Sequence, residues 1–220
     1  MTADIARTFA RKLLADYLAA ALWRTKSVRV NFAEPYKLVS GKLSPLYVNC
    51  RNLISDTTFP DALTLAAREI MAYGEVQFEM IAGGESAGIP VAAFLAKALG
   101  RPMVYVRKTA KDHGLGSRIE GQLLPDARVL LVEDLITDAG SKLSFIEALK
   151  AAGATVDDVL VVFDRLQGGR QALADHGIRL HALCDLADVL RVGIAIDRVT
   201  LHEAQMIREH LGLAAGEQRA

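Results

Sequence analysis

The strongest constraint on the fold is the alternation of short apolar segments with longer segments of helical periodicity. The runs at 129–132 and 159–163 contain no polar residue. Strands that are apolar on both faces and are separated by helices indicate a parallel sheet covered by helices, an α/β fold. The pattern predicts strands over 76–82, 103–106, 128–132, 159–163 and 180–183, and helices over 60–73, 86–99, 141–152 and 169–175. Ligands of such sheets bind beyond the carboxyl ends of the strands.

Both ends of the chain add elements to this core. Apolar residues recur at three- and four-residue spacing from Ile5 to Leu18, which predicts an amphipathic helix. Residues 28–54 are rich in turn residues and predict short strands, and residues 201–211 predict a terminal helix. We expect a single domain over 1–220, with the N-terminal helix and short strands in about 1–58 and the α/β core and C-terminal helix in about 59–220.

The composition excludes several classes of protein. The 26 basic and 26 acidic residues balance, which argues against broad nucleic-acid binding and against a polybasic membrane binder. No apolar run approaches the ~18 residues of a membrane-spanning helix. The two cysteines, Cys50 and Cys184, lie far apart, as is typical of a reducing compartment. We therefore expect a cytoplasmic globular protein that binds neither nucleic acid nor a membrane.

The segment after the strand at 128–132 has the residues of a sugar-phosphate site. Glu133 and Asp134 come first, and a loop with Thr137 and Ser141 leads into a helix. Loop amides and a helix N-terminus bind anions, and a carboxylate at a strand end can accept hydrogen bonds from sugar hydroxyls. Together these features suit a ribose 5-phosphate. The alternative is an ordinary helix N-cap at Thr137 or Asp138, with the two acids in solvent.

This segment resembles the phosphoribosyl-pyrophosphate (PRPP) signature of the type I phosphoribosyltransferases. One departure is Ala139, which stands where glycine is usual and fits only if the backbone needs no positive φ. The resemblance implies a parallel sheet flanked by helices, with an N-terminal helix and a strand-rich hood subdomain. It also implies that PRPP binds to Glu133, Asp134, Leu135, Ile136, Thr137, Asp138, Ala139, Gly140 and Ser141.

A strongly basic loop follows the strand that ends at Val106. Residues 107–118 hold four Lys or Arg side chains and His113 against a single acid. Such cations can stabilise the charge of a departing pyrophosphate, a flexible loop can close over a substrate, and an imidazole can donate a proton. The alternative is a solvated charged face.

The order of residues in this loop resembles the mobile catalytic loop of the orotate phosphoribosyltransferase family. The resemblance implies that the loop reaches into the neighbouring subunit of a homodimer. It implies that PRPP contacts Arg107, Lys108, Lys111 and His113. Lys111 is the strongest candidate for a catalytic residue, with His113 and Asp134 as further candidates.

Three further stretches match the same family. Residues 40–47 resemble its segment near the base, although Val39 stands where some members carry a lysine. Residues 81–90 follow a strand and open a helix, as in the family's pyrophosphate-binding region; Ile89-Pro90 rules out a Walker A loop there. The buried strand at 159–163 is followed by Asp164 and Arg165. A guanidinium binds a carboxylate through two parallel hydrogen bonds, so Arg165, together with Thr137, is the candidate orotate-binding residue.

The ordered set of motifs implies transfer of the 5-phosphoribosyl group from PRPP to orotate, giving orotidine 5′-monophosphate and pyrophosphate in pyrimidine biosynthesis. No protein metal site is expected, and Mg²⁺ is expected to be carried by PRPP. Two alternatives remain open: a phosphoribosyltransferase for another base, and a non-catalytic PRPP-sensing regulator on the same fold.

Overall fold

The computed structural model describes residues 2–37, 41, 43–72, 76–109 and 117–213. The chain forms two compact units, one of residues 60–183 and the other of residues 1–59 with 184–220. The predicted boundary near residue 58 coincides with the first division. Residues 184–220 group with the N-terminal segment. The expectation of a single domain stays a prediction.

The larger unit is built on a six-stranded sheet with the order β10-β9-β8-β5-β6-β7. Its strands are β5 (Met80–Gly84), β6 (Met103–Val106), β7 (Ile119–Glu120), β8 (Arg128–Ile136), β9 (Thr155–Asp164) and β10 (Arg179–Asp185). β5 pairs in parallel with β6 and β8, β8 pairs in parallel with β9, and β7 is antiparallel to β6. The predicted parallel α/β sheet is confirmed.

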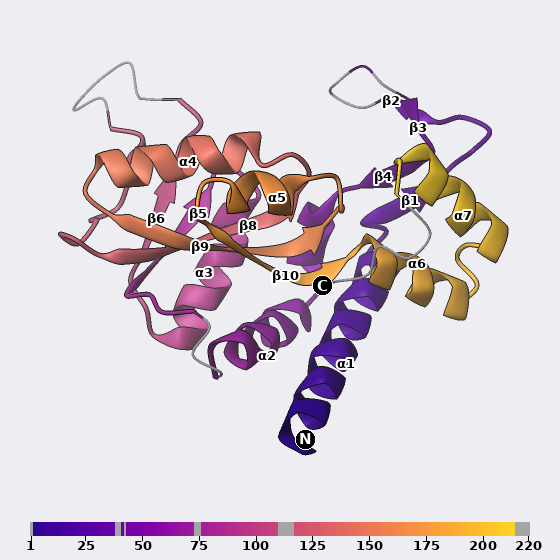
Figure 1. Cartoon of the computed structure of the whole chain (residues 1–220), viewed down its shortest axis with the longest axis horizontal. Helices are drawn as coiled ribbons and strands as arrows, with labels where there is room; N and C mark the ends of the chain where they lie inside the picture. Colours follow the sequence, from indigo (N-terminus) through magenta and orange to yellow (C-terminus); the bar gives the residue numbers. More distant parts are fainter. Residues whose placement is uncertain (1, 38–40, 42, 73–75, 110–116, 214–220) are drawn as a thin grey trace. The chain divides into compact units, whose positions relative to one another are not determined.

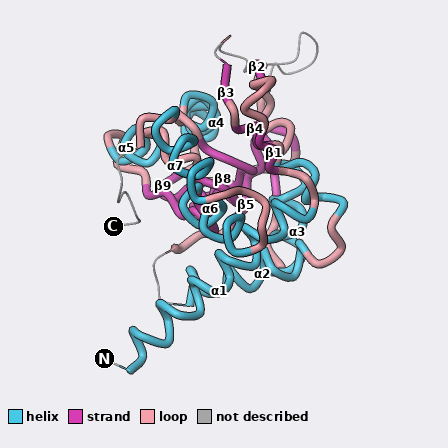
Figure 2. The backbone as a smooth tube through the Cα atoms, turned by 90° about the vertical axis from the view of Figure 1, so that its right-hand side faces the viewer, coloured by secondary structure: helices cyan, strands magenta, loops and turns pink. Residues whose placement is uncertain are grey.

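Helices cover both faces of this sheet. α4 (Gly140–Ala151) and α5 (Gly169–Ala174) lie on one face and α3 (Gly88–Leu99) lies on the other, next to α2 (Phe59–Ala72) (Figures 1 and 2). The apolar runs that predicted the strands supply the core between α4 and the sheet, where Leu131 and Val161 pack with Phe145 and Leu149. Burial of such side chains is the main favourable contribution to the folding free energy.

β8 is longer than the sequence predicts. The strand was expected to end at Val132, but it continues to Ile136, so that Glu133 and Asp134 lie within it. The cause is the parallel ladder with β9, in which Glu133 is in register with Val161 and Ile136 with Asp164. The ladder supplies hydrogen-bond partners for the backbone amides and carbonyls of this extension.

Other boundaries differ as well, among them the start of β9, which is Thr155 and not residue 159. β5 begins at Met80 and not at residue 76, and α3 begins at Gly88 and not at residue 86.

The smaller unit contains α1 (Thr2–Arg24), β1 (Val28–Val30), β2 (Tyr36–Lys37), β3 (Leu43–Ser44), β4 (Leu46–Val48), a 3-10 helix η1 (Cys50–Ser55), α6 (Leu186–Ala195) and α7 (Leu201–His210). α1 packs on α6, and the indole nitrogen of Trp23 donates to the Val189 carbonyl oxygen at 2.8 Å. α6 was not expected from the sequence. The apolar stripe predicted for α1 is only partly buried, because Ile5, Phe9 and Leu13 remain mostly exposed.

Candidate active site

The segments singled out in the larger unit meet at one edge of its sheet. Gly84 at the end of β5 is in register with Val106 at the end of β6, and Gly83 is in register with Val132 on β8. Ile136 on β8 is in register with Asp164 on β9. Because parallel strands end at the same edge, the segments at 84–88, 107–109, 133–141 and 164–169 are brought together.

The loop between β8 and α4 forms a turn that is open to solvent. Ala139 has φ 68 and ψ −4, the left-handed conformation, and the Asp138 carboxylate accepts a hydrogen bond from the Gly140 amide at 3.1 Å. Ser141 and Gly140 are exposed and Thr137 is half-buried. Ala139 occupies the N-cap position and has no side chain that can accept a hydrogen bond. The start of α4 is thus exposed, with Thr137 and Ser141 beside it, and a helix N-terminus in such a position suits an anion.

The positive φ at Ala139 answers the question raised by the sequence. The loop does need the left-handed conformation that favours glycine, and Ala139 adopts it with its methyl group buried. The loop packs closely against the backbone of Gly169. A Cβ atom at Gly169 would lie 2.7 Å from the Thr137 carbonyl oxygen, so only a glycine allows this approach. The tight turn is thus retained despite the departure from the family pattern.

Glu133 and Asp134 point to different surroundings. Asp134 is half-buried at the site, whereas the Glu133 side chain is only 7% exposed and its Oε2 lies 3.1 Å from Nζ of Lys142 on α4. Burial raises the pKa of the Glu133 carboxyl above its usual range, and the charge of Asp134 adds to this, while Lys142 and Lys108 oppose it. Asp134 is therefore the better placed of the two acids to accept hydrogen bonds from a sugar.

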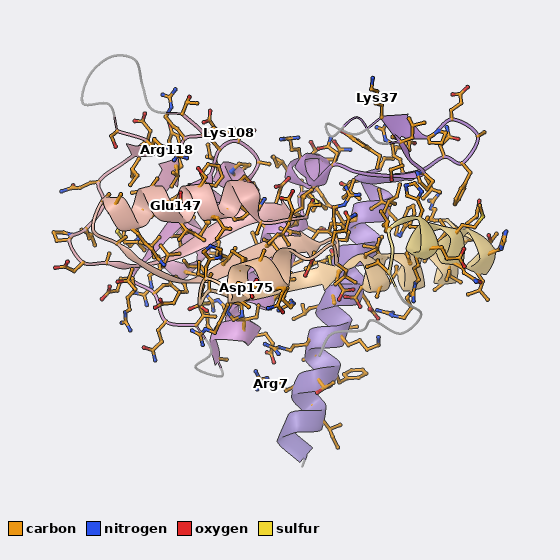
Figure 3. The ribbon with its side chains drawn as sticks, turned by 45° about the horizontal axis from the view of Figure 1, so that its top comes forward. Arg7, Lys37, Lys108, Arg118, Glu147 and Asp175 are labelled. Atoms are coloured by element: carbon orange, nitrogen blue, oxygen red, sulfur yellow. The ribbon has the colours of Figure 1, made fainter. Side chains whose placement is uncertain are left out.

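The basic loop is anchored at both of its described ends. The Lys108 amide donates to the Glu85 carboxylate at 2.7 Å, and Arg107 forms a 3.6 Å ion pair with Glu120. Arg118 donates to the Arg107 carbonyl oxygen at 3.0 Å and to the Ser144 hydroxyl on α4 at 3.1 Å. Figure 3 shows Lys108 and Arg118 near each other above α4. Lys108 is exposed, with its side chain available to an anion. The catalytic candidates Lys111 and His113 lie outside the described residues.

Arg165 lies beside the loop between β8 and α4, whose residues 137–141 form the candidate phosphate loop. Its amide donates to the Ile136 carbonyl oxygen at 3.1 Å, and its Nε donates to Gln167 at 2.9 Å. Asp164 accepts from the Leu166 amide at 2.8 Å and lies 3.8 Å from the Arg170 guanidinium. These contacts fix the turn after β9 and keep the candidate orotate-binding residue next to Thr137.

The predicted segment near the base belongs to the smaller unit. Its Ser44 is buried and hydrogen-bonded to the Leu46 carbonyl oxygen at 2.9 Å, and the ring of Tyr47 lies 5.4 Å from that of Tyr36. Arg51 is exposed. Val39, Ser40 and Lys42 lie outside the described residues.

Sequence reasoning missed Lys142. A signal was present, because a lysine in the first turn of a helix meets the positive end of the helix dipole and is unfavourable there unless a carboxylate offsets it.

Within the described part of the chain, no group of three or more His, Cys, Asp or Glu side chains could hold a metal ion. No described helix is long and apolar enough to cross a membrane.

The fold and this edge of the sheet define a phosphoribosyltransferase-type domain, and the family model described as "Phosphoribosyl transferase domain" matches residues 59–177. The chain is 45% identical over 185 residues to an orotate phosphoribosyltransferase of Rhizobium leguminosarum bv. trifolii, covering 82% of each chain. It is 43% identical over 203 residues to that of Rhizobium etli, covering 89% of this chain and 87% of the relative.

Solved structures agree with these relatives. The orotate phosphoribosyltransferase of Aeropyrum pernix has a TM-score of 0.67 at 29% identity, covering 79% of this chain and 97% of its own. The Mycobacterium tuberculosis enzyme in complex with PRPP has a TM-score of 0.65 at 28% identity, covering 80% of this chain and 98% of its own. The Leishmania donovani UMP synthase has a TM-score of 0.75 at 28% identity; the match covers 90% of this chain but only 42% of that longer one. The chain belongs to the phosphoribosyltransferase family, among the orotate phosphoribosyltransferases.

Proposed function

We propose that this protein transfers the 5-phosphoribosyl group from PRPP to orotate, giving orotidine 5′-monophosphate and pyrophosphate in pyrimidine biosynthesis. The observation that carries the proposal is a direct contact between the candidate orotate-binding residue and the strand that leads into the candidate phosphate loop. The amide of Arg165, the candidate for orotate recognition, donates to Ile136 at 3.1 Å, one residue before the start of the phosphate loop. This contact supports neighbouring positions for a base bound by Arg165 and a sugar phosphate bound by the loop, as glycosyl transfer requires.

Each part of the site has a role in the binding of PRPP. The loop amides and hydroxyls from Thr137 to Ser141 bind the 5-phosphate, and Asp134 accepts hydrogen bonds from the ribose hydroxyls. Lys108 and Arg107 bind the pyrophosphate beside the backbone of residues 84–88. Direct contact between Glu133 and PRPP stays a prediction, since its carboxylate faces Lys142.

The reaction is a displacement at the anomeric carbon with oxocarbenium character. The bond from this carbon to the pyrophosphate oxygen breaks, its electron pair leaves with pyrophosphate, and N1 of orotate forms the new bond and gives up its proton. We propose that Lys111 and the other loop cations stabilise the growing charge of pyrophosphate and that His113 donates a proton to it.

We propose Mg²⁺ as the cofactor, carried by PRPP. The carboxylates at the site suit this arrangement, because Glu133 is occupied by Lys142 and Asp134 alone cannot provide a cage. When bound, the ion neutralises part of the pyrophosphate charge. We further propose a homodimer in which the 107–118 loop completes the neighbouring subunit's site, acting in the cytoplasm.

A direct assay tests this function. Purified protein is mixed with orotate, PRPP and Mg²⁺, and the loss of orotate's ultraviolet absorbance is followed, with reactions lacking PRPP or containing a chelator as controls. The proposal requires loss that depends on both PRPP and Mg²⁺. Turnover of another base but not of orotate would overturn the role of Arg165, and PRPP binding without turnover of any base would indicate a regulator.

A further inference from the structure

Lys142 connects three parts of the site. Its ammonium lies 3.1 Å from Oε2 of Glu133 and donates to the Ser141 hydroxyl at 3.3 Å. The lysine is buried although it lies in the first turn of α4, where a cation is unfavourable by itself. The pair therefore persists because each charge offsets the burial of the other.

On the side away from Lys142, the Glu133 carboxylate packs against the backbone of residues 84–88, within the segment that resembles the family's pyrophosphate-binding region. A Cβ atom at Gly84 would lie 2.3 Å from Oε1 of Glu133, and one at Gly88 would also lie 2.3 Å from it. The carboxylate thus fills the space that a side chain would occupy at either glycine. Glu133 is in contact with β5, α3 and α4 at once, and its charge state affects all three.

The charge balance of the acid pair depends on the lysine. Glu133 and Asp134 are adjacent, and PRPP is strongly anionic. With Lys142 present, the ammonium offsets the charge of Glu133, and the three side chains together carry a net charge of about −1. Without it, two carboxylates would face an anionic substrate from inside a buried site, or Glu133 would take up a proton.

We propose that Lys142 is a positioning residue for PRPP: it holds the Glu133 carboxylate against Gly84 and Gly88, holds Ser141 in the phosphate loop, and cancels the charge that would otherwise repel the substrate. The inference rests on the proposed function, because PRPP is the ligand that the site then favours. Lys142 acts through Glu133 and Ser141 and does not itself touch the reacting atoms.

The sign of the effect of Lys142→Met depends on pH. Loss of the ammonium removes an interaction that lowers the pKa of Glu133, so this carboxyl holds its proton more tightly in the variant than in the wild type. While Glu133 is protonated, the net charge stays near that of the wild type and PRPP binding is retained. As the pH rises and Glu133 ionises, the KM and the Kd of Lys142→Met for PRPP increase by about tenfold relative to wild type. A tenfold change in Kd equals, in free energy, a pKa shift of about one unit.

The experiment compares KM for PRPP and the calorimetric Kd for PRPP with Mg²⁺, each from about pH 6 to about pH 9. Lys142→Met is expected to show the added pH dependence. Lys142→Arg keeps the charge and is expected to follow the wild type. The double variant Glu133→Gln/Lys142→Met has no carboxyl to titrate and is expected to lose the added pH dependence. Lys150→Met, at the exposed end of α4, is the matched control.

The outcomes are distinct. A wild type that neither binds PRPP nor consumes orotate overturns the proposed function. An active wild type with a Lys142→Met profile parallel to its own overturns the role of Lys142. If Lys142→Met does not fold, Lys142→Gln takes its place in the same comparison, and a Lys142→Gln profile parallel to that of the wild type overturns the role of Lys142.

Discussion

At the scale of the residue, Glu133 lies in the candidate site at a position that lowers the stability of the fold. Its carboxylate is buried beside a second acid, and Oε1 has no hydrogen-bond partner among the described residues. A buried acceptor in that position lowers stability, because it loses water without a full replacement. The ion pair with Lys142 reduces this loss but does not remove it, since the pKa of Glu133 is still raised.

The raised pKa predicts a pH-dependent stability. The folded protein binds a proton at Glu133 more tightly than the unfolded chain, so stability contributed by this group is present below its ordinary pKa and is lost as the pH rises through the folded value. Glu133→Gln does not titrate. Its thermal midpoint relative to the wild type is therefore expected to increase between about pH 4.5 and about pH 7. A constant difference across that range would contradict the burial of an ionising carboxyl.

Ala139 offers a second residue-scale prediction. Ala139→Gly relieves a left-handed strain of about 1 kcal/mol, but it removes a buried methyl worth about 0.8 kcal/mol and makes the unfolded chain more flexible. These effects nearly cancel, so the free energy of unfolding should change by less than about 1 kcal/mol. Ala139→Val adds a branched side chain at positive φ in a closed space and should destabilise by about 2 kcal/mol or more. Urea unfolding of both variants measures the contrast; equal effects would argue against the left-handed turn.

At the scale of the element, the basic loop depends on its attachment to α4. Arg118 bonds both the Arg107 carbonyl oxygen and Ser144, so the strand that leaves the sheet and the strand that returns are held together. A loop whose two ends are fixed loses less conformational entropy when it closes over a substrate. The contacts of Arg118 therefore support the proposed catalytic loop, although they do not involve the reacting atoms.

Arg118→Ala is expected to lower kcat/KM for PRPP by about tenfold, the effect of ~1.4 kcal/mol in loop ordering. The thermal midpoint should change little, because the lost bonds lie at the surface end of the sheet. Arg128→Ala is the control, since Arg128 bonds Gln77 at 2.9 Å at the opposite end of β8. Equal losses of activity in the two variants would show that loop anchoring is not the cause.

At the scale of the whole molecule, the proposed sharing of the loop predicts complementation between inactive subunits. Lys111→Ala removes the loop lysine and Arg165→Ala removes the orotate-binding arginine. In a mixed dimer, one site receives an intact loop from the Arg165→Ala subunit and keeps its own Arg165. Co-refolded mixtures should therefore regain about a quarter of wild-type turnover, because about half of the dimers are mixed and each has one complete site of two.

The matched control mixes Lys111→Ala with His113→Ala, two lesions in the part of the loop that is proposed to enter the neighbouring subunit's site. Each site then receives a damaged loop, so this mixture should show no gain over the separate variants. Turnover that stays at the level of the separate variants in the first mixture as well would indicate that each loop serves its own subunit.

Local patterns in the sequence were sufficient for much of the fold and the site. Apolar runs predicted the strands of the sheet, and the acids and the small and hydroxyl residues after the strand at 128–132 predicted the phosphate site, because these features depend on neighbours along the chain. The capping box of α6, in which Asp185 accepts from the Asp188 amide at 2.9 Å, was also readable and was overlooked. The helix that it begins packs on α1, which no local pattern could indicate.

The tertiary structure alone decided which acid is available and which lysine matters. Glu133 and Asp134 are equivalent in the sequence, but the ladder with β9 extends β8 through both and alternation along the strand turns one side chain toward Lys142 and leaves the other at the site. Local composition determines which elements form, since propensity and periodicity act over a few residues. Burial, charge balance and proton affinity are set by contacts between elements far apart in the chain, and these exist only once the sheet and α4 have packed together.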